Sequence, residues 1–241
     1  MKTLKNWILM LGILASATAM SSCLDDNDEW AEFWEDKVQA IVTVKPINDG
    51  SYYLQLDDST TLLPTNNYLP EVPDETRAYV IYEVKDSALT AYDKAINLVR
   101  LDTLLTKDIA PDLGTENDSY YGTDMLALNG SSVWAKEGVW IEDGYITFDF
   151  FLQQGYNDNV KHFINLVQTN SEDPYELEFR HNAYGDIDTN LPPVSGLVSF
   201  RLDKLPSTNG QTVKLKIKYK SFAINDYRTI ELDYRSYDEE E

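Results

Sequence analysis

The chain has 241 residues, and its 41 acidic residues against 20 basic ones give a net charge of −21. Because so acidic a chain repels a phosphate backbone, we do not expect nucleic acid among its partners. Hydrophobic residues make up 43% of the sequence, which is enough for packed cores and excludes global disorder.

Residues 1–22 have the pattern of a secretory signal peptide: a basic start, an apolar run and small residues. The apolar run covers residues 7–20 and falls short of the roughly 20 residues that a spanning helix needs. Two cleavage sites remain open. Residues 17–19 (ATA) fit ordinary processing, whereas residues 21–23 (SSC) fit the end of a lipobox, with Met20 where leucine is usual.

Cys23 is the only cysteine of the chain, so no disulfide can form within it. An unpaired cysteine in an oxidising compartment needs a reason, and acylation supplies one. Each buried methylene of an acyl chain adds about 0.8 kcal/mol of membrane attachment. We therefore predict that Cys23 is the acylated first residue of a lipoprotein, carrying palmitate-type chains into outer-membrane lipid.

An acidic tether over residues 23–36 follows, with Asp25, Asp26, Asp28 and Glu29 directly behind the cysteine. One interpretation is a solvated linker that holds the folded part away from the membrane. The other is a resemblance to the acidic export signal of surface lipoproteins in Bacteroidetes. That resemblance predicts an outer-membrane lipoprotein that faces the cell exterior.

Residues 37–109 are predicted to form a small closed β-barrel. The stretch VQAIVTVKP (38–46) alternates apolar and polar residues, and NDG (48–50) marks a tight turn. RAYVIYEV (77–84) is a further strand, whereas residues 95–106 fit both the helical and the strand period. About five short strands in this region favour a closed barrel, because closure removes exposed edges.

Residues 110–124 contain proline, glycine and acidic residues but no basic one, which predicts a linker between two domains. Strand patterns fill residues 125–238 and indicate a β-sandwich. The clearest is VKLKIKYK (213–220), whose apolar residues should face inward while its four lysines face solvent. We interpret the lysine row as protection of a strand edge and as balance for neighbouring acids. We expect Trp134 and Trp140 to fill the sandwich core.

Several stretches together resemble the NigD-like lipoproteins of Bacteroidetes. They are DGSYYLQLDDSTTLLPTN (49–66), INLV (164–167), LEFRHNAYGD (177–186), GLVSF (196–200) and VKLKIKYKSF (213–222). The resemblance implies an all-β chain with an N-terminal OB-like barrel and a C-terminal immunoglobulin-like β-sandwich behind a lipid anchor. It carries over no catalytic residues, and the family name comes from association with a bacteriocin gene cluster.

No stretch of the sequence predicts catalytic or metal chemistry. His162 and His181 lie 19 positions apart on separate predicted strands without a zinc-protease motif, so we expect each to be a strand residue in a hydrogen-bond network. DIDTN (186–190) opens like an EF-hand loop, but Leu191 and Leu197 occupy the positions where that loop needs glycine and glutamate. We expect no enzyme, no cofactor and no metal site.

Exposed aromatic side chains are the remaining candidates for ligand contact. Tyr156 in QGYNDN and Tyr184 in HNAYGD lie beside turn-forming residues and are the predicted ligand-binding residues. We expect a lipid-anchored interaction module that binds an envelope protein or a peptide such as a bacteriocin. The alternative is an accessory glycan-binding lipoprotein, which coplanar exposed rings would favour, whereas an exposed apolar patch would favour a protein partner.

Overall fold

The structure is a computed structural model that describes residues 34, 36–47, 50–66, 71–72, 74–86, 91–157, 159–169 and 172–236. The chain divides into a unit of residues 1–37 and a unit of residues 38–241, and the second holds all of the described strands. The predicted signal peptide and almost all of the predicted tether lie outside the described residues. None of the described helices is long and apolar enough to span a membrane.

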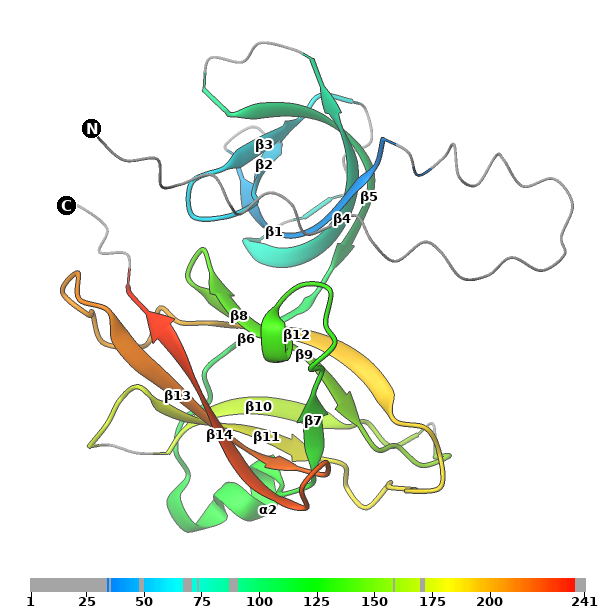
Figure 1. Cartoon of the computed structure of the whole chain (residues 1–241), viewed down its shortest axis with the longest axis vertical. Coiled ribbons are helices and arrows are strands. Elements are labelled where there is room, and N and C mark those ends of the chain that lie inside the picture. The colour runs from blue at the N-terminus through cyan, green and yellow to red at the C-terminus, as the bar shows by residue number, and fades with distance from the viewer. Residues whose placement is uncertain are drawn as a thin grey trace, which may run out of the picture. The chain divides into compact units, whose positions relative to one another are not determined.

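A closed five-stranded barrel is the first domain, as the sequence predicts (Figure 1). Its strands are β1 (Val38–Pro46), β2 (Tyr52–Gln55), β3 (Thr61–Pro64), β4 (Thr76–Lys85) and β5 (Lys94–Thr103). β1 pairs with both β2 and β4, and β3 pairs with β5 in parallel, so the ring closes in the order β1-β2-β3-β5-β4. Closure leaves no long edge open for pairing with another chain.

The barrel core explains why the ambiguous run at residues 95–106 becomes a strand. Ile96 and Leu98 alternate toward the interior and are 0% and 1% exposed, beside Val42 and Val80 at 0%. Period-two burial is what a strand provides and a helix does not. A bulge between Ile81 and Tyr82 adjusts the pairing of β4 with β5.

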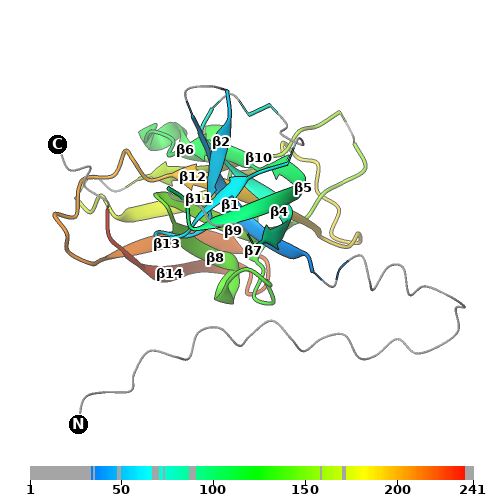
Figure 2. The same ribbon diagram turned by 90° about the horizontal axis from the view of Figure 1, so that it is seen from above.

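The second domain is a β-sandwich, and the remaining described strands belong to it. They are β6 (Leu105–Asp108), β7 (Leu126–Leu128), β8 (Val139–Glu142), β9 (Tyr145–Leu152), β10 (Phe163–Gln168), β11 (Glu176–Asn182), β12 (Val194–Arg201), β13 (Val213–Ser221) and β14 (Asp226–Tyr234). One layer pairs β6-β12-β9-β8 and the other pairs β10-β11-β13-β14, with β7 bonded to both β9 and β13. The long β13 and β14 run side by side in both views (Figure 1, Figure 2).

Aromatic rings from the two layers meet in the sandwich core. Phe148 of β9 stacks on Phe179 of β11 with ring centroids 4.1 Å apart and an interplanar angle of 9°. Phe200 of β12 meets Phe148 edge to face at 6.0 Å. The neighbouring inward positions of β13, Leu215 and Ile217, are both 0% exposed. The predicted inward row of VKLKIKYK is therefore confirmed.

The connection between the domains differs from the predicted linker at residues 110–124. β6 pairs in parallel with β12, so the sandwich begins at Leu105, ahead of the predicted start at residue 125. The segment also contains the 3-10 helix η1 (Gly114–Glu116) and the helix α2 (Asn117–Tyr121). Asn117 and Tyr121 are buried, because α2 packs on β10 and β11. Its proline, glycine and acidic residues thus belong to a folded segment.

Two further expectations about side chains need correction. β13 lies between β11 and β14, so its lysines do not protect an edge. They do balance acids on both sides, as expected: Lys216 pairs with Asp173 ahead of β11 at 2.9 Å, and Lys214 pairs with Asp233 of β14 at 2.6 Å. Trp134 is absent from the sandwich core and packs edge-on against Tyr79 of the barrel at 6.0 Å.

Candidate functional site

Two loops meet at one end of the sandwich because of how their flanking strands pair. Residues 153–162 join β9 to β10, and residues 183–193 join β11 to β12. The last residue of β9 pairs with the first of β12, and the first residue of β10 pairs with the last of β11. Both loops therefore start and finish where these strand ends come together.

Asp186 fastens the two loops to each other. Its carbonyl oxygen accepts the Gly155 amide over 3.0 Å, and its carboxylate oxygen Oδ1 accepts the Asn157 amide over 3.3 Å. A Cβ atom added at Gly155 would collide with that carboxylate. Any larger residue at position 155 would thus displace the Asp186 carboxylate from its present place.

Tyr156 and Tyr184 lie on these two loops, so the structure brings both predicted residues to the same end of the sandwich. The two residues are 78% and 59% exposed. Tyr184 has a left-handed backbone with φ of 50°, and its amide donates to the Asn182 side chain over 3.0 Å. That either ring contacts a ligand stays a prediction.

Phe163 and Ile187 extend the exposed apolar area, and the sequence interpretation missed both. They are 46% and 40% exposed. The Phe163 ring meets the Tyr184 ring edge to face, with centroids 5.7 Å apart and planes at 82°. Strand parity could have identified Phe163, since its neighbour Ile164 faces the core. Tyr156, Phe163, Tyr184 and Ile187 are named the aromatic surface below.

A buried histidine pair lies between the same loops. His162 Nδ1 is 2.9 Å from His181 Nε2, and His181 Nδ1 is 3.3 Å from the Met125 carbonyl oxygen. His162 Nε2 lies 3.4 Å from Asp186 Oδ2, and neither atom has a hydrogen bond in the described part of the chain. Burial lowers the pKa of His181, which is 0% exposed. Each histidine thus has a hydrogen-bond partner, as expected, and the fold joins both in one network, although His162 lies just ahead of β10 and not on a strand.

Apart from His162 Nε2 and Asp186 Oδ2, the polar groups named here have protein partners in an arrangement that does not suit a metal ion. The His162 and His181 nitrogens face each other, and Asp188 Oδ1 accepts the Asn190 amide at 2.9 Å and its side chain at 2.8 Å. Across the described residues, no three His, Cys, Asp or Glu side chains gather as metal ligands would.

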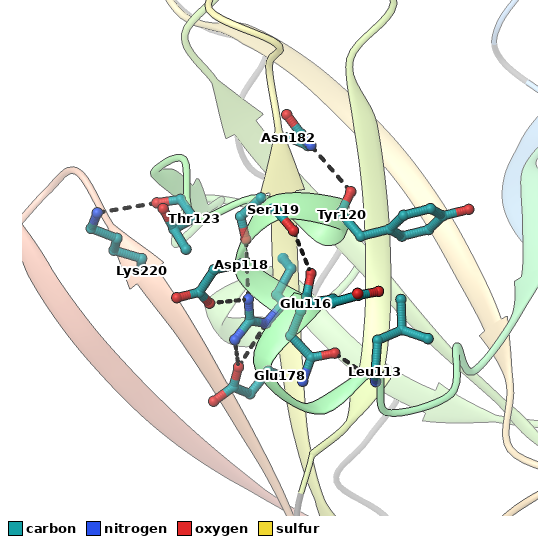
Figure 3. A network of polar contacts seen from close by, with 12 residues as sticks. Leu113, Glu116, Asp118, Ser119, Tyr120, Thr123, Glu178, Asn182 and Lys220 are labelled. Carbon is teal, nitrogen blue, oxygen red and sulfur yellow. Dashed lines mark hydrogen bonds and ion pairs between the residues drawn. The ribbon is translucent and has the colours of Figure 1, made fainter.

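An ion-pair network ties α2 to β11, the strand that leads into the loop of Tyr184 (Figure 3). Arg180 bonds Asp118 of α2 at 2.8 Å and Glu178 at 2.5 Å. Asn182 donates to the Tyr120 carbonyl oxygen over 3.1 Å, while the Tyr120 ring points away from the network (Figure 3). The predicted linker is thus held rigidly where the loops emerge.

A concavity of about 1240 Å³ lies where the β8–β9 turn approaches the barrel. Its carboxylates bind protein groups: Glu75 accepts the Tyr145 hydroxyl at 2.8 Å, and Asp143 pairs with Lys45 at 2.9 Å. Burial raises the pKa of Tyr145, which keeps this hydroxyl a donor. The described contacts of these groups join the barrel to the sandwich.

The predicted anchor and export residues, Cys23, Asp25, Asp26, Asp28 and Glu29, lie outside the described residues. Their roles stay predictions.

Comparison with known proteins agrees with the two-domain architecture. The sequence model of the NigD-like N-terminal OB domain matches residues 41–104, and that of the NigD-like C-terminal beta sandwich domain matches residues 108–234. The boundary between the matches falls at β6, as in the structure. No curated protein matches the chain.

Solved structures with the same fold come from Bacteroides and Parabacteroides. A protein of Parabacteroides distasonis that carries the name toxin related protein is 36% identical, with a TM-score of 0.69 over 83% of this chain and 94% of its own. A NigD-like immunity protein of Bacteroides caccae is 19% identical, with a TM-score of 0.58 over 82% and 97% of the two chains. A protein of Bacteroides fragilis named as a lipoprotein is 14% identical, with a TM-score of 0.60 over 84% and 100%. With its barrel and sandwich both matched, the chain belongs to the NigD-like family.

Proposed function

We propose that the protein is a lipid-anchored, non-enzymatic binding module of the cell envelope. In this proposal Cys23 holds it to outer-membrane lipid, the acidic tether presents it outside the cell, and the aromatic surface binds a protein or peptide partner. The names immunity protein and toxin-related protein among its relatives make a bacteriocin-like peptide one candidate partner.

The observation that carries the proposal is the aromatic surface on two fastened loops. These apolar side chains are 40–78% exposed, and a partner that covers them lowers the free energy by removing apolar surface from water. Aromatic residues are enriched at protein interfaces, and rigid loops lose little entropy on binding. The Phe163 and Tyr184 rings stand at 82° to each other, which suits interdigitating side chains better than the flat face of a sugar.

Binding is tested with residues 24–241 as bait against solubilised outer-membrane extract, followed by titration of the purified partner. Tyr184→Ala should weaken the affinity by at least tenfold, because central aromatic residues commonly contribute more than about 1.4 kcal/mol. Tyr227→Ala is the matched control, since Tyr227 is 46% exposed on β14 and lies outside the aromatic surface. Equal affinities for the two variants would refute the proposed surface. Retention on polysaccharide with no protein partner would favour the glycan-binding alternative.

The anchor is tested separately from binding. Cys23→Ser should release the protein from the membrane fraction and abolish incorporation of labelled palmitate. Replacement of Asp25, Asp26, Asp28 and Glu29 by alanine should leave acylation intact but protect the protein from protease added to whole cells. Undiminished surface proteolysis of that variant would contradict an export role for the acidic cluster.

A further inference from the structure

Hydrogen-bond directions around the histidine pair fix how many protons it must hold. The Met125 carbonyl oxygen can only accept, so His181 Nδ1, 3.3 Å away, must carry a proton. The bond between His162 Nδ1 and His181 Nε2, 2.9 Å long, needs one further proton. At the other end, the Asp186 carboxylate is also an acceptor, 3.4 Å from His162 Nε2.

Complete satisfaction of this chain therefore needs three protons: one on His181 Nδ1, one between the two rings, and one between His162 Nε2 and Asp186 Oδ2. Two neutral imidazoles carry only two. Without the third proton, the lone pair of His162 Nε2 faces the Asp186 carboxylate, and two buried acceptors repel each other. Neither atom has another described hydrogen-bond partner that would relieve this conflict.

The surroundings place the extra charge on His162. The Asp186 carboxylate adjoins its Nε2, and the two side chains are each 9% exposed, so their attraction is weakly screened. His181 is more deeply buried, and its burial and the neighbouring His162 both lower its pKa, whereas the Met125 bond and Asp124 act to raise it. Asp124 is occupied by the Ala183 amide at 2.7 Å, and Asp188 by Asn190, which leaves Asp186 as the counter-ion.

We propose that His162 and Asp186 form a proton-dependent clasp that holds the aromatic surface in its binding shape. This inference rests on the proposed function, because it states how binding at that surface is regulated. With the proton present, His162⁺ and Asp186⁻ fasten the loop that carries Tyr156 to the loop that carries Tyr184. As pH rises and the proton leaves, the clasp opens, the two loops separate, and partner affinity falls.

The proton is measured on the protein alone, by nitrogen-15 NMR of the imidazole rings of residues 24–241 between pH 5 and 9. The chain contains two histidines, and His162→Gln assigns the two sets of signals. We expect His162 with both nitrogens protonated over a range in which His181 carries only Nδ1–H. A pair that contains two neutral rings throughout pH 5–8 would overturn the clasp.

The substitution Asp186→Asn distinguishes the effect of the proton on the two loops from the effect of side-chain packing. The amide of an asparagine can donate to neutral His162 Nε2 while its oxygen still accepts the Asn157 amide, so no extra proton is needed. In the native chain, protection of the Gly155 and Asn157 amides should fall roughly tenfold on loss of the proton, after correction for base-catalysed exchange. In Asp186→Asn it should stay constant with pH. The same pH dependence in both chains would refute the clasp.

Partner affinity measured at the two ends of the pH range connects the clasp to function. Weaker binding at high pH in the native chain, but not in Asp186→Asn, is the expected result. Binding with no pH dependence in the native chain, despite the NMR signature, would overturn the regulatory link. Binding that Tyr184→Ala leaves unchanged would instead refute the proposed binding surface, so the two failures are distinguishable.

Discussion

Replacement of Phe179 by alanine should destabilise the sandwich by about 3–5 kcal/mol, the usual cost of removing a core phenylalanine. Phe179 is 2% exposed and stacks on Phe148 at 4.1 Å. It also meets Phe150 and Phe200 edge to face at 5.6 and 6.2 Å, so one ring connects three strands of the sandwich. Since a domain is stabilised by roughly 5–15 kcal/mol, this loss should remove a large share of the total.

Phe163→Ala is the matched control, because the same side chain is deleted from the same layer at a position that is 46% exposed. Its cost should stay below about 1 kcal/mol, in the range of surface substitutions. Equilibrium urea unfolding, followed by circular dichroism and tryptophan fluorescence, measures both variants. Equal destabilisation by the two substitutions, or a loss below about 1 kcal/mol for Phe179→Ala, would refute the described core. Phe163→Ala should also weaken partner binding without unfolding the domain.

Substitutions at three further residues test electrostatics elsewhere in the fold. Arg77 is 0% exposed and 3.5 Å from Glu142, so Arg77→Ala should cost about 3 kcal/mol by urea unfolding, because it leaves Glu142 unpaired and a cavity in the core. Arg77→Met should cost less, because methionine fills most of that volume. Partial burial acts to raise the pKa of Asp57, but hydrogen bonds in its own turn outweigh it and lower that pKa. Asp57→Ala should therefore lower the free energy of unfolding by about 0.5 kcal/mol at pH 7, with solvent screening taken into account. The difference in stability between the native chain and the variant should disappear as the pH is lowered below about 4 and the Asp57 carboxylate takes up a proton. Lys216→Glu places like charges beside Asp173, 2.9 Å from the native ammonium, and should lower the urea midpoint more at low salt than at high salt.

The alternation of apolar and polar residues in the sequence was sufficient to predict the strands and their buried faces. It was not sufficient to predict which strands pair or how the two domains connect. Alternation in VKLKIKYK correctly gave its inward face, since period-two burial is local. Its partner strands are not local, which is why the lysine row was assigned to an edge although β13 lies inside a layer. Residues 110–124 misled for a similar reason. A short helix such as α2 is stabilised by packing, and composition alone reads its acids and glycines as a linker.

The candidate site shows the same division between local and long-range information. Turn residues beside Tyr156 and Tyr184 were enough to predict exposed rings, because turns lie at the surface. That the two rings share one end of the sandwich depends on the pairing of β9 with β12 and of β10 with β11. The histidine pair is a stronger case, since His162 and His181 are 19 positions apart and each is unremarkable in its own stretch. Tertiary pairing places the Met125 carbonyl oxygen at one end of the two imidazole rings and the Asp186 carboxylate at the other. A search for local sequence motifs could therefore not have found this arrangement.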